Sequence, residues 1–461
     1  MQTGTRRIVG WLAALAVAVV LPVIVVGRCS VADFGTAPDT SSLRSAQAKS
    51  EGMTRKELTA AEERFAGLEP RLDNSPLSAG NRVTLLLDGE GTYPAMLDAI
   101  AGARNHIHLE TYIMLDDEVG NRFADALIAR SRDGVAVRLI YDGFGGTDAN
   151  DFWKRLTDAG VQVFENNPPE PTENADVTSY NNRDHRKILV VDGKIAFTGG
   201  INIYDVYANR ATDDSGGSLK GSGASSPSKP KNMRWRDTHL RIEGPAVAEL
   251  QKLFVAQWEQ ENGSIEDGDL YPKQRRMGRA SVKILAGVGD NAKPSEIYAA
   301  YLNVIGKAEK RIWITQAYFV PNDEFMIVLR EAAQRGVDVK IILPGKTDVA
   351  LIRHASRALY GKLLEAGVQI FEFQDAILHA KTAVVDDVWS TVGSSNLDFR
   401  SFLINDEVNA VVIDAAFAGE MERAFLADLE DTRQITLESW KNRPLGYKLI
   451  EVAAGWFKPW I

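Results

Sequence analysis

Hydrophobic and polar positions alternate with two different periods along most of this chain. The segments 107–113 and 135–141 are dense in aliphatic and β-branched residues, which is typical of buried strands. The segments 123–131 and 152–159 instead place apolar residues three or four positions apart, as amphipathic helices do. A further short strand is expected at 161–164. This alternation of strands and helices predicts an α/β fold with a mixed sheet.

The same pattern occurs twice, because segments of the first half return in the second half in the same order. They are residues 132–138, residues 159–165 and the surroundings of His185, which return at 334–340, at 366–372 and around His379. We therefore expect two tandem copies of one α/β domain, at 81–262 and 281–440, joined by a polar connector at 263–280.

The N-terminus departs from this pattern with an uncharged, apolar run at residues 8–26. A run of about 20 apolar residues spans the hydrocarbon core of a bilayer. The run is also longer than the apolar core of a typical secretory signal. We therefore expect a transmembrane helix in an N-terminal anchor at 1–28, followed by a linker and a short helix at 29–80.

Two alternatives stay open for this anchor. Small residues at Ser30 and Ala32 would suit cleavage of a signal peptide. Cys29 would suit lipidation, although Arg28 precedes it where a small residue is expected. If the run is retained, the arginines before it would hold the N-terminus inside and place the rest of the chain outside.

Two other segments stand out by composition. Residues 211–231 are rich in glycine, serine and proline, and we expect a mobile insertion there within the first domain. The C-terminal segment 441–461 combines Trp456, Phe457 and Trp460 with a lysine. This combination predicts an amphipathic, interfacial element, with a simple cap on the domain as the alternative.

Composition narrows the classes of function. The 461 residues carry a formal net charge of −9, which disfavours a nucleic-acid-binding protein because such proteins carry basic faces. The single cysteine excludes an internal disulfide and a cysteine-built zinc site. His106 and His108 share one face of a predicted strand, but we interpret them as sheet residues rather than metal ligands. We expect neither a metal nor a cofactor.

Two copies of one motif, H-x-K-x4-D, carry the strongest chemical signal. The residues are His185, Lys187 and Asp192 in the first copy and His379, Lys381 and Asp386 in the second. In a strand, side chains two positions apart share a face, so each imidazole and ammonium point to one spot. An imidazole is a nucleophile or an acid/base near neutral pH, and an ammonium holds a phosphate oxygen. We group both aspartates with the catalytic residues, with a turn or scaffold role as the alternative.

Two further elements follow each motif. A glycine-containing turn ends in an asparagine in both copies and predicts phosphate-binding groups, namely Asn202, Ser395 and Asn396. A carboxylate then begins a strand-like run, at Asp237 and at Glu407. We expect these carboxylates to orient the two histidines, since a carboxylate bonded to one ring nitrogen fixes an imidazole. The alternative is a charge at a strand edge.

These motifs resemble those of the phospholipase D superfamily, and the residues around them are similar to those of bacterial cardiolipin synthases. The similar segments are 183–187, 199–203, 366–368, 378–381 and 393–401. The resemblance covers residues 83–440 and implies two tandem, pseudo-symmetric phospholipase D-like domains, each a mixed β-sheet flanked by helices. The single N-terminal apolar run and the insertion at 211–231 depart from the family's pattern.

The resemblance implies a phosphatidyltransferase that makes cardiolipin from two phosphatidylglycerol molecules, or from phosphatidylglycerol and another phospholipid. His185 would attack the phosphorus to form a phosphohistidine, and His379 would act as acid and base. The lysines and asparagines would neutralise the phosphoryl oxygens. The partners would be anionic phospholipids and a membrane, without nucleic acid. The location would be a bacterial cell membrane, with the catalytic domains on its outer side.

Two other hypotheses remain open at the level of sequence. A hydrolase of the same superfamily, acting on a phospholipid or on a nucleic acid, would use the same histidines with water as acceptor. A catalytically silent membrane scaffold would keep the fold, but intact motifs in both copies disfavour it. The sequence leaves the acceptor alcohol and the oligomeric state open.

Overall fold

The computed structural model describes residues 55–67, 75–168, 182–208, 234–265, 268–289 and 294–455. The expected anchor at 1–28, the expected insertion at 211–231 and the end of the C-terminal segment lie outside these ranges. Within them, no helix has the length and the apolar character that crossing a membrane requires.

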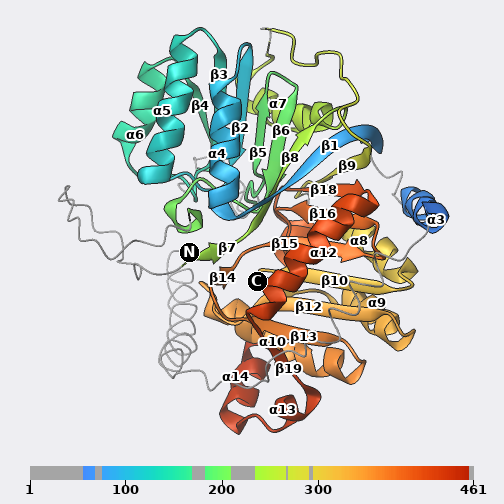
Figure 1. Ribbon diagram of the computed structural model, residues 1–461. Helices are drawn as coiled ribbons and strands as arrows, with labels where there is room; N and C mark the ends of the chain where they lie inside the picture. Colours follow the sequence, from blue (N-terminus) through green and yellow to red (C-terminus); the bar gives the residue numbers. More distant parts are fainter. Residues whose placement is uncertain are drawn as a thin grey trace, which may run out of the picture.

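Two α/β units repeat the same order of elements and meet along their sheets (Figure 1). The first unit consists of β1 (Ser78–Leu87), α4 (Asp88–Ala101), β2 (His106–Thr111), α5 (Glu118–Arg132), β3 (Ala136–Asp142), α6 (Asn150–Asp158), β4 (Gln162–Asn166), β5 (Ile188–Val191), β6 (Ile195–Gly199), the 3₁₀ turn η2 (Asp205–Tyr207), β7 (Trp235–Arg236), β8 (Thr238–Glu243) and α7 (Val247–Asn262).

The second unit repeats this order with a few additions. It consists of β9 (Ala280–Gly287), α8 (Glu296–Lys307), β10 (Arg311–Gln316), β11 (Phe319–Val320), α9 (Asp323–Gln334), β12 (Asp338–Pro344), α10 (Ala350–Glu365), β13 (Gln369–Phe373), β14 (Ile377–Leu378), β15 (Lys381–Val385), β16 (Trp389–Gly393), β17 (Leu397–Asp398), α11 (Phe399–Leu403), β18 (Glu407–Ile413), α12 (Ala415–Glu430) and β19 (Thr432–Ile435). Outside the two units lie α3 (Arg55–Ala66), α13 (Leu437–Lys441) and α14 (Leu445–Gly455).

One continuous mixed sheet joins the two units. Its order is β19-β13-β12-β10-β15-β16-β18-β9-β1-β8-β6-β5-β2-β3-β4, so corresponding strands take corresponding places on either side of the β9–β1 junction. The pairs of β3 with β2 and β4 are parallel, as are the pairs of β12 with β10 and β13. Strands β1 and β9 pair antiparallel, with Ser78 opposite Val282. The internal repeat therefore becomes a pseudo-twofold arrangement, and the predicted mixed α/β fold with two repeats is confirmed.

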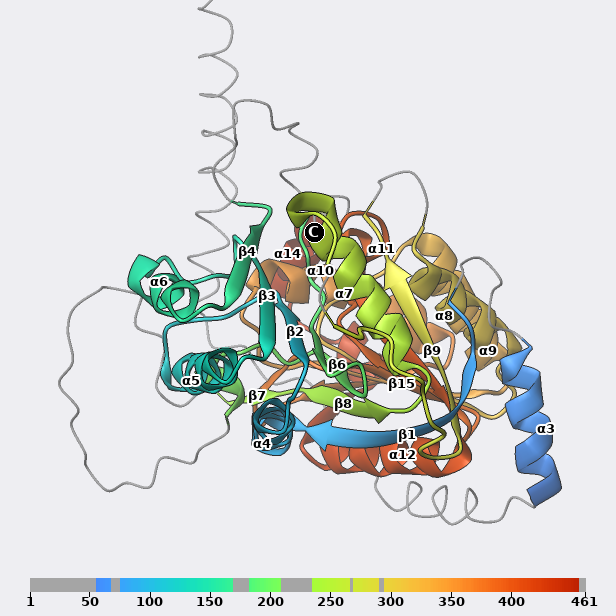
Figure 2. The same ribbon diagram turned by 90° about the horizontal axis from the view of Figure 1, so that it is seen from above.

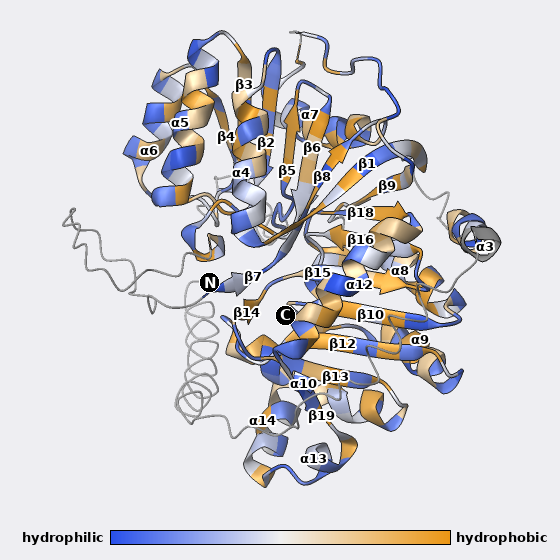
Figure 3. Cartoon of the chain, viewed as in Figure 1, coloured by the Kyte–Doolittle hydropathy of each residue, from blue (hydrophilic) through white to orange (hydrophobic). Residues whose placement is uncertain are grey.

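Each sheet is covered on both faces, because alternate residues of a strand point in opposite directions. On β2, Ile107 and Leu109 pack in the same cluster as Phe123 of α5, whereas His106 and His108 bond Gln251 of α7. The strands accordingly carry much of the hydrophobic colour, and the outer faces of α5 and α6 are largely polar (Figure 3). Figure 2 shows α7 separated from α4 and α5 by the strands between them.

Side-chain caps fix where several helices begin, and they shift one predicted boundary. Asp117 accepts a hydrogen bond from the backbone N–H of Gly120, so α5 begins at Glu118 rather than near Phe123. The helices α8, α9 and α12 begin in the same way after Ser295, Asn322 and Asp414. Strand β2 ends at Thr111, two residues before the predicted end at position 113.

Two flanking segments pack on the second unit. Phe65 of α3 is fully buried in that unit's core. At the other end of the chain, Ala454 of α14 packs against Ala355 of α10, and Glu451 bonds the buried Arg357. The described part of the C-terminal segment thus caps α10.

Candidate active site

The two H-x-K motifs lie at the interface between the two units. The backbone N–H of His185 donates to the carbonyl of Asp406 at 2.9 Å, and the N–H of His379 donates to the carbonyl of Arg236 at 2.8 Å. In both cases the histidine belongs to one unit and the carbonyl to the other. Two further backbone contacts join the units at these places, namely the strand pair β14–β7 and the isolated bridge between Asp184 and Asp406. Each histidine is therefore held by the other unit's chain.

Each imidazole also bonds a carboxylate from the other unit. Nδ1 of His379 lies 2.7 Å from Oδ2 of Asp237, and Nδ1 of His185 lies 2.9 Å from Oε2 of Glu407. Both carboxylate side chains have 0 % exposure. Because Nδ1 is engaged with an acceptor, Nε2 is the ring nitrogen left for chemistry. The expected orienting carboxylates thus lie against the histidines, and the structure adds that the pairing crosses between units.

The environment of each carboxylate differs. Glu407 accepts hydrogen bonds from the hydroxyls of Ser394 at 2.5 Å and Ser401 at 2.7 Å. Asp237 instead accepts from the N–H of Thr238 at 2.7 Å and lies against Gly200. A Cβ at position 200 would come within 2.2 Å of Oδ1 of Asp237, so only glycine leaves room for this shorter carboxylate.

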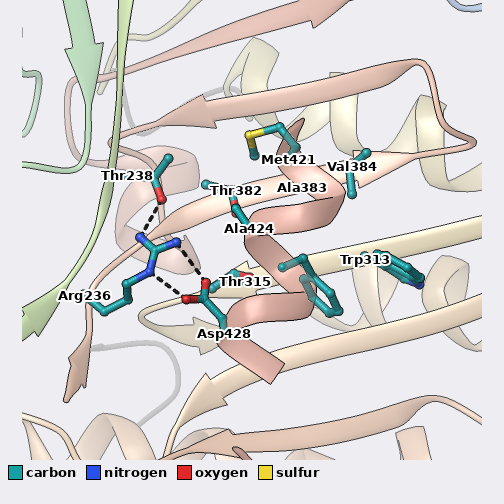
Figure 4. Close-up of a pocket in the computed structure, with 11 residues that line it drawn as sticks. Arg236, Thr238, Trp313, Thr315, Thr382, Ala383, Val384, Met421, Ala424 and Asp428 are labelled. Carbon is teal, nitrogen blue, oxygen red and sulfur yellow. Dashed lines mark hydrogen bonds and ion pairs between the residues drawn. The ribbon is translucent and has the colours of Figure 1, made fainter. Parts of the chain in front are cut away.

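A buried ion pair fixes the strand that carries Asp237. Arg236 donates from Nε and NH2 to the two carboxylate oxygens of Asp428 on α12, at 2.7 and 3.0 Å. The same guanidinium donates to Thr238 at 3.0 Å, in a pocket between α12 and β15 (Figure 4). A bidentate pair of this kind restrains geometry strongly, so β7 of the first unit is anchored to a helix of the second.

The lysines lie beside the histidines, as the two-residue spacing predicts. Nζ of Lys187 donates to the carbonyl of His185 at 2.6 Å. Nζ of Lys381 donates to the carbonyl of His379 and lies 3.1 Å from its Nδ1. Burial lowers the pKa of Lys187 to about 7 and that of Lys381 to about 8. Burial of an ammonium favours its neutral form, and an incoming anion would favour the charged form again.

The two histidines share one electrostatic environment. Burial is the main cause that lowers the pKa of His185, against the opposing effect of Glu407. Burial and then Lys381 lower the pKa of His379 well below its ordinary value, and the charges of His185 and Lys187 act in the same direction. The four groups therefore act on each other across the interface between units. A phosphodiester anion bound among them would raise both histidine pKa values.

The residues expected to bind phosphate differ in how many of their side-chain polar atoms already have partners in the protein. Asn202 accepts from the N–H of Ile113 at 3.1 Å and donates to the hydroxyl of Tyr207 at 2.9 Å, so both ends of its amide have protein partners. The hydroxyl of Ser395 donates to the carbonyl of Asn396 at 3.1 Å. The side-chain oxygen of Asn396 is buried without a hydrogen-bond partner in the described part of the chain.

The motif aspartates lie elsewhere. Asp192 accepts the N–H groups of Arg104, Asn105 and His106, with Oδ1 2.7 Å from the nitrogen of Asn105. Its φ of 52° places it in a tight turn beyond β5, at the opposite end of that strand from Lys187. This position fits the turn or scaffold role, which was the alternative for Asp192.

Asp386 repeats this arrangement in the second unit, with one addition. It has a φ of 51° and accepts the N–H groups of Glu309, Lys310 and Arg311. Its Oδ2 also lies 2.6 Å from the guanidinium of Arg64 on α3. Both aspartates therefore hold the turn after the catalytic strand, and Asp386 docks α3 as well.

Three residues of the site had no role assigned from sequence. Ser394 and Ser401 hold Glu407, and the hydroxyl of Tyr207 lies 3.3 Å from Nδ1 of His379. A signal for Tyr207 exists in the repeat, because it follows Asn202 by five residues, as Ser401 follows Asn396. No group of histidine, cysteine, aspartate and glutamate residues in the described ranges could hold a metal ion.

A centre with two H-x-K motifs, each oriented by a carboxylate of the other repeat, defines a phospholipase D-type protein. Comparison with known families agrees, since the model described as "Cardiolipin synthase, PLD-like domain" matches residues 96–213 and 301–429. The chain belongs to this cardiolipin synthase family of phospholipase D-like proteins.

Individual relatives cover most of the chain. A cardiolipin synthase of Alkalihalophilus pseudofirmus is 34% identical over 396 residues, which are 85% of this chain and 75% of the relative. Cardiolipin synthase 1 of Bacillus cereus is 34% identical over 385 residues, covering 81% and 72%. The solved phosphatidylserine synthase of Haemophilus influenzae Rd KW20 shares the fold, with a TM-score of 0.61 at 15% identity, covering 86% of this chain and 100% of that one.

Proposed function

We propose that this chain is a phosphatidyltransferase that makes cardiolipin from two phosphatidylglycerol molecules and releases glycerol. The observation that carries the proposal is the pair of histidines, each bonded at Nδ1 to a buried carboxylate of the other unit. Such a pair provides two imidazoles with free Nε2 atoms in one site. The names of the relatives supply the specific lipid reaction.

In the first half-reaction, Nε2 of His185 attacks the phosphorus of one phosphatidylglycerol. A phosphorus–nitrogen bond forms, the phosphorus–oxygen bond to glycerol breaks, and protonated His379 gives its proton to the departing oxygen. The bound anion favours the protonated form of His379 that this step needs. Lys187 and Lys381 neutralise the oxygens of the phosphoryl group in the transition state.

In the second half-reaction, neutral His379 takes the proton from a head-group hydroxyl of a second phosphatidylglycerol. That oxygen attacks the phosphorus, the phosphorus–nitrogen bond breaks, and His185 is released unchanged. The side-chain amides of Asn396 and Asn202 are the proposed phosphate-binding groups, because their NH₂ groups can donate to the phosphoryl oxygens. We further propose that the reaction takes place at a bacterial cell membrane, with the N-terminal run as anchor and the domains on its outer side.

Water as acceptor would make the same centre a hydrolase, and this is the alternative that a product assay separates. The full-length protein is incubated with phosphatidylglycerol vesicles, with and without phosphatidylethanolamine, and the products are identified by mass spectrometry. Cardiolipin with released glycerol, absent with His379→Ala, is the expected result. Phosphatidic acid alone would replace the transferase with a hydrolase, and the absence of any product from the wild type would favour a silent scaffold.

The roles of the two histidines have their own test. A phosphodiester lipid with a p-nitrophenolate leaving group needs no proton from an acid. With this substrate, His379→Ala should still form an acid-labile phosphoenzyme and release p-nitrophenol, whereas His185→Ala should form none. The reverse result would exchange the two roles. Thermal unfolding of both variants at the wild-type temperature shows that the fold is kept.

A further inference from the structure

The rim of the site carries an anionic pair beside His379. The ring of Tyr318 lies edge-on to the imidazole, with 6.5 Å between centroids and an interplanar angle of 88°. The Tyr318 hydroxyl donates to the carboxylate of Asp348, with both Oδ atoms at 2.9 Å. Asp348 is exposed, just before α10. A hydroxyl and a carboxylate are thus available at the surface next to the imidazole.

The charge of Asp348 reaches the reacting groups. Burial is the main cause that lowers the pKa of His379, and Asp348 is among the charges that oppose it. The same holds for Lys381, whose pKa burial lowers to about 8 against the effect of several carboxylates, Asp348 among them. The carboxylate therefore belongs to the same centre as His379, although it lies on a different loop from both motifs.

The other half of the rim combines charges of both signs. The ring of Tyr112 lies 5.0 Å from that of His185. Burial and then the charge of Asp142 raise the pKa of its hydroxyl to about 12, while the charges of Arg183 and Arg400 oppose this rise. Two guanidinium groups thus act on the His185 half, where a lipid phosphate would form its bond to nitrogen, whereas the His379 half has the exposed carboxylate of Asp348 bonded to Tyr318.

We propose that Tyr318 and Asp348 bind a free hydroxyl of the polyol head group whose reacting oxygen faces His379. The inference rests on the proposed function, because it places the alcohol on the acid/base side. A carboxylate is an acceptor only, so it accepts a hydrogen bond from a second hydroxyl on the same short carbon chain. A neutral polyol suits a centre that already contains two ammonium groups, since it adds no further positive charge. The pair thereby selects polyols over simple alcohols.

Two soluble acceptors of equal carbon number test this selection. Glycerol and 1-propanol both offer a primary hydroxyl, but only glycerol carries further ones. The wild type should transfer the phosphatidyl group to glycerol with a higher kcat/KM than to 1-propanol. Asp348→Ala should reduce this ratio by about five- to tenfold, as expected for one hydrogen bond, through a higher KM for glycerol. Asp348→Asn should keep most of the ratio, because its amide oxygen still accepts a hydrogen bond.

The ratio also serves as an internal control, since a folding defect would lower both rates together. If Asp348→Ala left the ratio of the two kcat/KM values unchanged, the proposal would be overturned. An equal loss of the ratio in Asp348→Asn would also overturn it, because the preference would then depend on the charge of Asp348 and not on its acceptance of a hydrogen bond. The matched control is Glu324→Ala, which removes the carboxylate of another tyrosine pair, 2.7 Å from the hydroxyl of Tyr298, and should leave the ratio unchanged. If the wild type formed cardiolipin but transferred to neither alcohol, this inference alone would fail, whereas the absence of cardiolipin as well would remove the proposed function.

Discussion

The two halves of the active site have the same architecture but different side chains around the histidine. In one half, Nδ1 of His185 faces the carboxylate of Glu407, which two serine hydroxyls hold from behind. In the other half, Nδ1 of His379 faces Asp237, and Lys381 and Tyr207 lie within 3.3 Å of the same nitrogen. The repeat thus fixes where the imidazoles stand, and burial is the main cause that lowers the pKa of both, while their hydrogen-bond partners differ between the copies.

One pair of corresponding positions shows how the difference arises. Gly200 in the first unit and Ser394 in the second each follow the glycine that ends β6 or β16. The serine hydroxyl reaches the longer Glu407, whereas the missing side chain of Gly200 lets the shorter Asp237 approach. A change in carboxylate length is therefore matched by a change of side chain at the neighbouring turn. We interpret this as two solutions to one task, the orientation of Nδ1.

Replacing the two orienting carboxylates by amides should change kcat more than any other substitution considered for the two halves. Glu407→Gln and Asp237→Asn should each lower kcat by up to roughly 10⁴-fold, the loss found when a carboxylate that orients a catalytic histidine becomes an amide. The loss should be greater for Glu407→Gln, because its new NH₂ group would face the hydroxyls of Ser394 and Ser401. Initial rates of cardiolipin formation measure both values.

A milder variant is the control for this prediction. Ser394→Ala removes one donor to Glu407 but keeps the carboxylate, so kcat should fall only severalfold. Equal activity of Glu407→Gln and the wild type would contradict the orienting role. Equal losses for the two amides would show that the serines do not distinguish the halves.

The lysines allow a sharper comparison through pH. Lys187, with a pKa of about 7, loses its charge before Lys381, with a pKa of about 8. Below these values the ammonium groups attract the phosphodiester, and above them they do not, so kcat/KM should fall as the pH rises through about 7 to 8. In Lys187→Arg the guanidinium stays charged, since its pKa exceeds 12. The fall should then begin about one pH unit later.

The pH profile of kcat/KM for phosphatidylglycerol, measured from about pH 6 to 9, gives the test because it reports groups of the free enzyme. Lys252→Arg is the matched control, since Lys252 is exposed and pairs with Glu249 on α7. Its profile should coincide with that of the wild type. A Lys187→Arg profile that falls at the same pH as the wild type would assign the titration to another group.

Sequence reasoning went furthest where the chemistry is local. The two-residue spacing of His379 and Lys381 predicted that an ammonium lies beside an imidazole, and Nζ of Lys381 lies 3.1 Å from Nδ1 of His379. The order of the repeats was likewise enough to predict two α/β units. By contrast, the partner of His185 is 222 residues away and comes from the other unit. That pairing depends on how the two units pack against each other, which no pattern within one copy encodes.

The motif aspartates show the opposite case, in which residues close together in the sequence lie apart in the structure. A spacing of seven residues joined Asp192 to the catalytic group in the sequence, yet a strand of four residues separates it from Lys187 in space. The same signature therefore combines two places: the histidine and lysine lie at one end of β5, and the aspartate accepts backbone N–H groups at the other. Recurrence of a residue in a motif does not distinguish chemistry from turn formation, whereas its hydrogen-bond partners do.

The smallest expected effect on turnover, and the clearest difference in stability, comes from these aspartates. Asn tolerates the left-handed backbone, so Asp192→Asn and Asp386→Asn keep the turns while weakening the bonds to backbone N–H groups. Each should cost about 1–3 kcal/mol of folding free energy, with kcat changed less than about threefold. Asp386→Asn should cost more, because it also removes the charge that pairs with the guanidinium of Arg64.

Thermal unfolding and kcat, measured on the same preparations, separate the two roles. The double variant Arg64→Ala with Asp386→Asn should be only slightly less stable than Asp386→Asn, since the ion pair is already lost in the single variant. Arg64→Ala alone should then account for the difference between the two aspartates. A loss of kcat as large as that of the carboxylate variants, without a change in unfolding temperature, would return the aspartates to the catalytic group. The distance along β5 and β15 argues against that outcome, because a turn at the far end of a strand reaches the phosphate only through the strand itself.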